Sequence, residues 1–416
     1  MGITYKNEIP YIEEQNLVDL TESIQTPFYI YSQKGIVDTF LEFKKILNKD
    51  IYYAIKANSN QAIIALLNTL GAGADVVSQE EMQRALAAGV ASEKIIFEGV
   101  GKSKSEITNA INYNIKQINI ESIEELRLID TIANTLNKKP RIGLRVNPDI
   151  NADTLDKIST GQKTDKFGID FDQLQNLCEI LKSLKNIKFE GLSCHIGSQI
   201  FNLNIFERIF KTMKYAVQIF QSNNLPINHL DLGGGFGIPY DRTQKELDIR
   251  KLSILVDKYY PNPSFKISFE PGRYLVAHAG YLITKILTNK QNGKLNFLIT
   301  DAGMQTLLRP AMYNSFHKIL PFNKKGKETT YTIAGPICES SDILGKDIKL
   351  PEQNKDNFLI ICDVGAYGAV MASNYNSKCL PAEVLVNDNK YAIIRDQEKI
   401  ETLIKKDRLP GWLITN

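Results

Sequence analysis

Eight short apolar runs, each suited to a β-strand, alternate with segments of helical pattern across the first two thirds of the chain. The segments beginning at Ser78 and Ser122 open with a helix-capping residue, followed by apolar residues at three- and four-residue spacing. Eight strand–helix units over roughly 200 residues favour a (β/α)8 barrel of the TIM type over an open doubly wound sheet. The runs are Ile51–Lys56, Gly73–Val77, Lys94–Glu98, Gln117–Ile120, Arg141–Asn147, Phe189–His195, His229–Leu232 and Lys266–Glu270.

After Arg273 the pattern changes to alternating apolar and β-branched residues, which is typical of an antiparallel sheet. Residues 27–31 are also strand-like, so we expect the N-terminus to join this second sheet. We therefore predict a barrel domain at 29–275 and a C-terminal, largely antiparallel β domain formed by 1–28 with 276–416. The strands expected there are 281–287, 295–300, 331–334, 357–361 and 383–386.

Composition narrows the classes of partner. The 416 residues carry 50 Lys and Arg against 47 Asp and Glu, a formal charge of +3 without separation of sign along the chain. This balance argues against nucleic-acid and membrane-surface partners and favours small molecules or further copies of the chain. The five cysteines include no CxxC pair and no His-rich tract accompanies them, so we expect a reduced cytoplasmic protein without a metal site.

In a (β/α)8 barrel the working residues lie where each strand ends, and here those positions are polar. Lys56 ends the first run and Asp75 lies in the second. A lysine at a strand end is ordinarily solvated. If it is desolvated, its pKa falls and the neutral amine is a nucleophile toward aldehydes. Several of the polar strand ends are equally suited to be helix caps or solvated loop residues.

The segment from Gly233 to Gly237 follows the seventh run, where glycines let backbone N–H groups approach an anion. Barrels of this kind bind phosphate in the loops after the seventh and eighth strands, and Arg273 would add a charge there. A plain tight turn is the alternative. His195 ends the sixth run and Ser198 follows it; the histidine could stack on a planar ring or serve as a core residue.

Glu270 to Arg273 ends the eighth run. A buried carboxylate there can keep a ring nitrogen protonated and strengthen the ring as an electron sink, or form an internal Glu–Arg pair. In the C-terminal half, Arg309 and Tyr313 are four residues apart, on one face if helical, and suit a carboxylate. Cys338 with Glu339 places a thiol beside an acid, and a glycine-rich turn carries Tyr367.

Taken together, these segments resemble the fold-type III pyridoxal-phosphate decarboxylases, which are alanine racemase-like, over most of the chain. The telling segments are Tyr53–Asn58, Ser159–Gly161 with Lys166–Gly168, His195–Gln199, Gly233–Gly235, Glu270–Arg273, Asp301–Met304, Arg309–Tyr313, Cys338–Ser340 and Met371–Asn376. One departure follows the eighth run, where Tyr274 and His278 stand in place of the small or amide residues more common in the family.

The resemblance implies that Lys56 holds pyridoxal 5'-phosphate through its amine and, with Cys338, is catalytic, Cys338 being the better proton donor. It implies that Glu270 faces the pyridine nitrogen and that His195 stacks on the ring. It also implies a homodimer in which Cys338 and Glu339 reach the partner's site. The implied cofactor-binding residues are Lys56, Asp75, His195, Ser198, Gly234, Gly235, Glu270, Gly272, Arg273 and Tyr367. The implied substrate-binding residues are Arg273, Arg309, Tyr313, Glu339 and Tyr367.

The activity implied is decarboxylation of meso-2,6-diaminopimelate to L-lysine and carbon dioxide. Two alternatives stay open. A decarboxylase of another basic amino acid or of a carboxylated polyamine would need an acidic far pocket in place of Arg309 and Tyr313. A non-catalytic regulatory homologue would be expected to lose parts of the cofactor set, whereas Lys56, His195, Glu270 and Cys338 are all present.

Overall fold

The computed structural model describes residues 2–152, 160–241 and 244–413. Its contacts divide the chain into two compact units. One is the continuous stretch Val37–Leu275, and the other combines Met1–Ile36 with Val276–Asn416. The second unit is therefore assembled from both ends of the chain.

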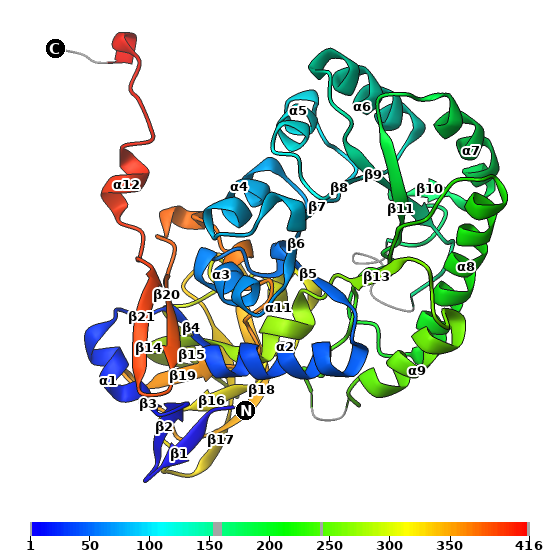
Figure 1. Ribbon diagram of the computed structural model, residues 1–416. Coiled ribbons are helices and arrows are strands. Elements are labelled where there is room, and N and C mark those ends of the chain that lie inside the picture. The colour runs from blue at the N-terminus through cyan, green and yellow to red at the C-terminus, as the bar shows by residue number, and fades with distance from the viewer. Residues whose placement is uncertain (1, 153–159, 242–243, 414–416) are drawn as a thin grey trace. The chain divides into compact units, whose positions relative to one another are not determined.

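In the first unit, eight parallel strands of the described chain form a closed barrel (Figure 1). They are β5 (Asp50–Ala54), β6 (Gly73–Val76), β7 (Ile95–Phe97), β8 (Gln117–Ile120), β9 (Arg141–Asn147), β11 (Lys188–Ser193), β12 (His229–Asp231) and β13 (Lys266–Phe269). The ring closes because β13 pairs with β5 and β8 pairs with β9. A short strand, β10 (Ile169–Asp170), pairs with the end of β9. The predicted barrel and its eight strands are confirmed.

Helices surround the ring of strands in Figure 1. Ser78 and Ser122 cap the fourth and sixth helices as predicted, because each side chain accepts a backbone N–H of the first turn. The helices of this part are α2 (Gln33–Leu47), α3 (Gln61–Thr69), α4 (Gln79–Ala87), α5 (Lys104–Asn112), α6 (Ile123–Leu136), α7 (Leu174–Ser183), α8 (Leu203–Ser222), α9 (Ile249–Tyr259) and α10 (Arg273–Val276). Short 3-10 turns of this part are η1 (Ile55–Ala57), η2 (Ser92–Lys94) and η4 (Phe171–Gln173), whereas η5 (Ala277–Ala279) belongs to the second unit.

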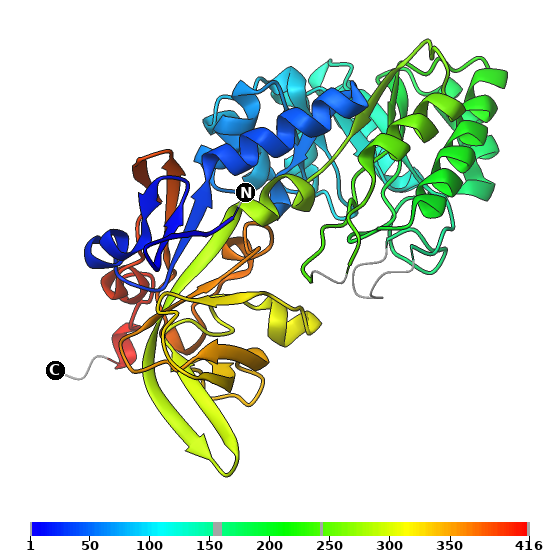
Figure 2. The ribbon, with the colours of Figure 1, turned by 90° about the horizontal axis from the view of Figure 1, so that it is seen from below.

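The second unit is built on a mostly antiparallel sheet whose main path runs β18-β17-β15-β14-β4-β20-β21, with β19 pairing to both β14 and β16. Two pairs, β15–β17 and β20–β4, are parallel. Its strands are β4 (Phe28–Ser32), β14 (Gly280–Asn292), β15 (Leu295–Thr300), β16 (Ile319–Pro321), β17 (Glu328–Ala334), β18 (Ile343–Pro351), β19 (Phe358–Ile361), β20 (Ala382–Asn387) and β21 (Lys390–Arg395). Figure 2 shows the long β14–β15 hairpin in yellow-green.

Smaller elements complete this unit. A three-stranded sheet at the N-terminus leads into α1, and α11 lies between β15 and β16. These elements are β1 (Thr4–Lys6), β2 (Ile9–Ile12), β3 (Gln15–Asn16), α1 (Leu17–Ser23), α11 (Arg309–Tyr313), η6 (Ala369–Met371), η7 (Tyr375–Ser377), α12 (Ile400–Ile404) and η8 (Gly411–Leu413).

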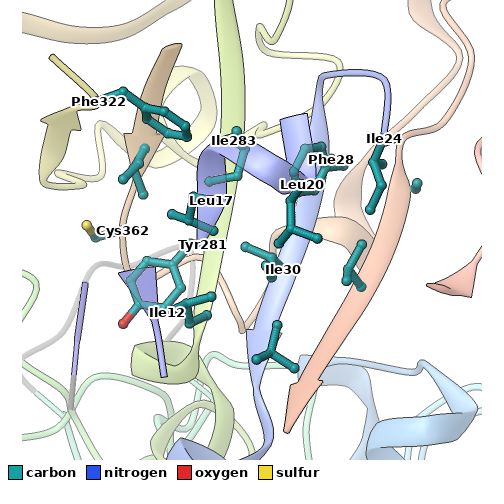
Figure 3. Close-up of a cluster of buried hydrophobic side chains, with 14 residues drawn as sticks. Ile12, Leu17, Leu20, Ile24, Phe28, Ile30, Tyr281, Ile283, Phe322 and Cys362 are labelled. Carbon is teal, nitrogen blue, oxygen red and sulfur yellow. The ribbon is translucent and has the colours of Figure 1, made fainter. Parts of the chain in front are cut away.

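An apolar cluster joins α1 to the sheet of the second unit (Figure 3). Leu17 and Leu20 of α1 pack with Phe28 and Ile30 of β4 and with Ile283 of β14, all fully or almost fully buried. Burial of such side chains contributes about 1.5–3 kcal/mol each, so this cluster holds the N-terminal segment in the unit. The expected joining of the N-terminus to the second sheet is observed, because β4 pairs with β14 and β20.

The five strands predicted after Arg273 are all present, whereas β16, β18 and β21 were not predicted. Within the residues that the structure describes, none of the helices is both long enough and apolar enough to cross a membrane.

Candidate active site

Lys56 lies in η1, directly after β5, and its Nζ is 3.2 Å from Oδ2 of Asp75. The two residues come together because Ala54 at the end of β5 pairs with Asp75 in the neighbouring strand β6. The lysine side chain is 32% exposed, whereas the aspartate side chain is fully buried. The amine therefore sits at the carboxyl end of the barrel, half-buried and paired, rather than on the solvated outer surface.

Burial raises the pKa of the Asp75 carboxyl above its ordinary value, while the charge of Lys56 acts in the opposite direction. The second carboxylate oxygen, Oδ1, has no hydrogen-bond partner among the described residues. A buried polar atom without a partner is costly, so this oxygen is placed to accept a further donor.

His195 follows β11 and is half-buried. The backbone N–H of Gly234 donates to its Nδ1 at 3.2 Å. The pKa of the imidazole is lowered well below its ordinary value, mainly by burial and further by the charges of Lys56 and Arg145. Because Nδ1 accepts the Gly234 N–H, the ring carries its proton on Nε2 and offers a flat, uncharged face.

The glycine-rich turn after β12 is a place where side chains do not fit. Gly235 has φ +90°, and a Cβ added there would lie 2.6 Å from the carbonyl oxygen of Gly197. At Gly234 an added Cβ would lie 2.2 Å from the carbonyl oxygen of Glu270. Asp231 braces the turn, because its Oδ1 accepts the N–H of Gly233 at 2.8 Å. Because these glycines carry no side chains, the backbone N–H groups of the turn can approach an anion, which suits a phosphate group.

Gly235→Ala is expected to weaken binding of a phosphate-bearing cofactor at least about tenfold, because alanine is strained at positive φ and its methyl group would displace Gly197. Titration of cofactor-free protein with pyridoxal phosphate measures the change. Gly101→Ala is the matched control, since a Cβ there meets nothing within 4 Å. Equal affinities for the two variants would contradict the assignment of the turn.

Arg273 begins α10 and is buried. It donates to Ser198 Oγ from Nε at 3.2 Å and from NH2 at 3.0 Å, and from NH1 to the Tyr240 hydroxyl at 2.8 Å. A guanidinium fixed by two hydroxyls beside a glycine-rich turn is suited to bind an anion. Gly272 precedes it, and a Cβ there would lie 3.0 Å from that of Ala57, so a side chain would crowd the segment carrying Lys56. Tyr240 was not singled out from the sequence.

Glu270 follows β13 and is 4% exposed. Its pKa is raised well above the ordinary value, first by burial and then by the nearby negative charges of Asp231, Asp75 and Glu98. Oε1 of Glu270 has no hydrogen-bond partner among the described residues. A protonated ring nitrogen would supply both the missing donor and the missing positive charge.

These barrel residues fit pyridoxal phosphate by their chemistry. Lys56 offers an amine for its aldehyde, and the turn at Gly235 with Arg273 offers an anion site. His195 offers a neutral planar partner and Glu270 an acceptor for the ring nitrogen. They follow four barrel strands, β5, β11, β12 and β13, at the end of the barrel where catalytic groups gather.

Arg145 lies in β9, within the predicted run Arg141–Asn147, and is buried. Its NH1 is 3.0 Å from Glu121 and 3.8 Å from Glu98, and NH2 donates to the backbone carbonyl of His195 at 3.2 Å. Arg145 thus links the acidic barrel interior to the segment carrying His195. Arg145 is 24 residues from Glu121 and 50 residues from His195 in the sequence, so no local pattern could predict these contacts.

In the second unit, Arg309 and Tyr313 lie at the two ends of α11, so the predicted helical spacing is confirmed. Arg309 is buried and Tyr313 is half-buried. The NH1 group of Arg309 lies 2.9 Å from Nε2 of His317, a residue that the sequence did not mark. His317 lies eight residues after Arg309 and beyond the end of α11, so helical spacing does not predict their contact.

Cys338 and Glu339 are exposed in the described chain. The Tyr375 hydroxyl donates to one oxygen of Glu339, and Ser341 Oγ donates to the other at 3.0 Å. These two bonds, that of Tyr375 first, lower the pKa of Glu339. The carboxylate is thereby held ionised and oriented on the surface of its unit.

The remaining residues of interest lie in turns and packing contacts. Tyr367 has φ +56° and is half-buried in its glycine-rich turn. His278 pairs through Nδ1 with Asp363 Oδ1 at 2.6 Å. Tyr274 packs against Phe43 and Phe236 in the first unit. Tyr274 is thus a packing residue of the barrel unit.

Known proteins match nearly the whole chain. The family model described as pyridoxal-dependent decarboxylase, pyridoxal binding domain, matches residues 33–277. The diaminopimelate decarboxylase of Aquifex aeolicus is 37% identical over 405 residues, covering 97% of this chain and 96% of the relative. The solved diaminopimelate decarboxylase from Helicobacter pylori complexed with L-lysine has a TM-score of 0.90 and 37% identity, covering 94% of this chain and 99% of that one. The enzyme from M. jannaschii in co-complex with L-lysine has a TM-score of 0.94 and 35% identity, covering 99% of both chains.

Proposed function

Because the chain belongs to the pyridoxal-dependent decarboxylases, and within them to the diaminopimelate decarboxylases, we propose that it converts meso-2,6-diaminopimelate to L-lysine and carbon dioxide. Its cofactor is pyridoxal phosphate. The observation that carries the proposal is the convergence on one barrel end of the Lys56 amine, the glycine-rich turn and the buried Glu270 carboxylate, whose Oε1 has no hydrogen-bond partner among the described residues.

Pyridoxal phosphate, when bound, supplies a ring that accepts the electron pair left by departing carbon dioxide. Lys56 would hold the cofactor through its aldehyde and release it to the substrate amine. Glu270 would accept a hydrogen bond from the ring nitrogen and keep that nitrogen protonated. Asp75, His195, Gly234 and Gly272 would complete the cofactor site, and Tyr367 would contact cofactor and substrate.

Phosphate would be bound by Ser198, Gly235 and Arg273. Arg273 already donates to Ser198 in the barrel unit, which supports this role. The carboxylate that the substrate keeps would be bound by Arg309 and Tyr313, with Arg273 contributing, since guanidinium groups pair with carboxylates through two donors. Glu339 would bind the distal ammonium group, and its ionised, oriented carboxylate supports that role.

A proton must replace the lost carboxylate on the reacting carbon. We assign this donation to Cys338 Sγ, with the freed Lys56 amine as the second candidate. The exposure of Cys338 and Glu339 supports their reaching the active site of a partner subunit, so the enzyme would be a homodimer with shared sites. The cysteines of the described chain are free, which supports a cytoplasmic location.

The substrate assignment predicts that carbon dioxide release from meso-diaminopimelate exceeds that from lysine, ornithine or arginine by at least roughly a hundredfold in kcat/KM. The reason is that the last three lack the second carboxylate, which leaves Arg309 and Tyr313 without their partner. A carbon dioxide release assay on the cofactor-loaded enzyme makes the comparison. Similar values for meso-diaminopimelate and lysine would instead favour a decarboxylase of other basic amino acids.

A further inference from the structure

The contact between Arg309 and His317 has only one possible direction. A guanidinium group donates hydrogen bonds and cannot accept them. Nε2 of His317, 2.9 Å from Arg309 NH1, must therefore be the acceptor. Nδ1 lies 3.0 Å from the carbonyl oxygen of Cys362, which can only accept. The imidazole is consequently neutral and carries its proton on Nδ1.

The backbone fixes the position of this histidine. Strand β16 begins two residues after it and pairs with β19 through Ile319 opposite Ile361. The pairing extends one step further, because the N–H of Cys362 donates to the carbonyl of Lys318 at 2.8 Å. The sheet thus fixes the position of the Cys362 carbonyl oxygen that accepts the hydrogen bond from His317 Nδ1. On the other side, Asn314 in the left-handed region ends α11 and turns the chain from Arg309 toward His317.

Both side chains are deeply buried, Arg309 being 5% and His317 1% exposed. A buried arginine needs acceptors for its donors, and this acceptor is uncharged. An aspartate or glutamate at the same position would neutralise the guanidinium. The neutral imidazole instead orients the group while adding no negative charge that would compete with a bound carboxylate.

We propose that His317 is a positioning residue for substrate recognition: it accepts a hydrogen bond from Arg309 through Nε2 and so aims the guanidinium at the carboxylate that the substrate retains. This inference rests on the proposed function, which gives Arg309 its ligand. His317 itself touches neither substrate nor cofactor in this assignment, and it acts only through Arg309.

Two amide variants separate the two hydrogen bonds of the ring. In His317→Gln the side-chain amide reaches the position of Nε2 and can still accept from Arg309. In His317→Asn it reaches only the position of Nδ1, so it can donate to Cys362 but leaves Arg309 without this acceptor. We expect His317→Gln to keep KM for meso-diaminopimelate within about threefold of the wild type, and His317→Asn to raise it at least about tenfold. In both variants we expect kcat to change little.

A second readout identifies which part of the ligand is affected. L-lysine keeps the carboxylate assigned to Arg309, whereas cadaverine, the corresponding diamine, lacks it. His317→Asn should weaken inhibition by L-lysine about as much as it raises KM, and inhibition by cadaverine should stay the same. Equal weakening of both inhibitors would point to general loss of structure and would overturn the proposal. So would equal KM values for the Gln and Asn variants.

A third measurement depends on no activity. The nitrogen chemical shifts of ¹⁵N-histidine-labelled protein distinguish the two neutral tautomers, and comparison with His317→Gln assigns the signal among the four histidines of the chain. We expect the Nδ1–H form, and the Nε2–H or doubly protonated form would refute the pairing. If the wild type released no carbon dioxide from meso-diaminopimelate, the proposed function would fail, whereas the spectrum and titration with L-lysine would still decide the role of His317.

Discussion

Replacing Lys56 by alanine should abolish decarboxylation and remove the visible absorption band of the bound cofactor. Both follow from one property, since no other group assigned to this end of the barrel is an amine able to bind the aldehyde covalently. The residual rate should lie at least about a thousandfold below the wild type, as is common when a covalent catalytic group is lost. Absorption spectroscopy of purified protein and the carbon dioxide assay measure the two effects.

Lys56→Arg refines this experiment, because arginine keeps a positive charge beside Asp75 but cannot form the covalent bond. It should resemble Lys56→Ala in both spectrum and activity while preserving the fold. Lys251→Ala, at an exposed lysine of α9, is the control for loss of any lysine. A visible band that survives in Lys56→Ala would show that the cofactor is held elsewhere.

Mixing Lys56→Ala with Cys338→Ala protein should restore activity that neither variant has alone. If each active site combines the barrel of one subunit with the Cys338 segment of the other, a mixed dimer contains one site without either lesion. Random exchange makes half of the dimers mixed, so recovery should approach roughly a quarter of wild-type activity. The assay is carbon dioxide release after denaturant-assisted or slow spontaneous exchange.

The matched control mixes Lys56→Ala with Glu270→Ala. Both lesions lie in the barrel unit, so every mixed dimer keeps one lesion in each site and no activity should return. Subunit exchange is verified with differently tagged chains. Exchange without recovery in the Lys56 and Cys338 mixture would mean that each chain supplies its own thiol, and it would remove the argument for shared sites.

The barrel was predictable because its strands are buried on both faces. In β6 and β8 every residue is buried, so these strands do not show the regular alternation of apolar and polar residues that a half-exposed strand has. The second sheet was harder to read. In β18, Lys346 and Asp347 are exposed, and β21 is half-exposed or exposed throughout, so neither shows a regular apolar pattern.

Some residues of the candidate site could likewise be predicted from the sequence, and others could not. Lys56 and Asp75 could be placed near each other because they end adjacent parallel strands of a predicted barrel. His317 could not, since its position depends on the pairing of β16 with β19, and a strand of three residues carries too little pattern to be recognised. Tyr240 escaped for a related reason, because it lies in a loop and meets Arg273 only in the folded barrel unit.

The place of β4 between β14 and β20 has a consequence for biosynthesis. The residues of the barrel unit are contiguous and have all been synthesised once the ribosome reaches Leu275. Strand β4 is synthesised before the barrel unit, but its second neighbour, β20, ends only at Asn387. During translation this apolar strand must therefore wait for more than 300 residues, roughly 15–60 seconds at ordinary elongation rates, before both of its edges are paired. Over that interval its unpaired backbone groups are open to pairing with another chain.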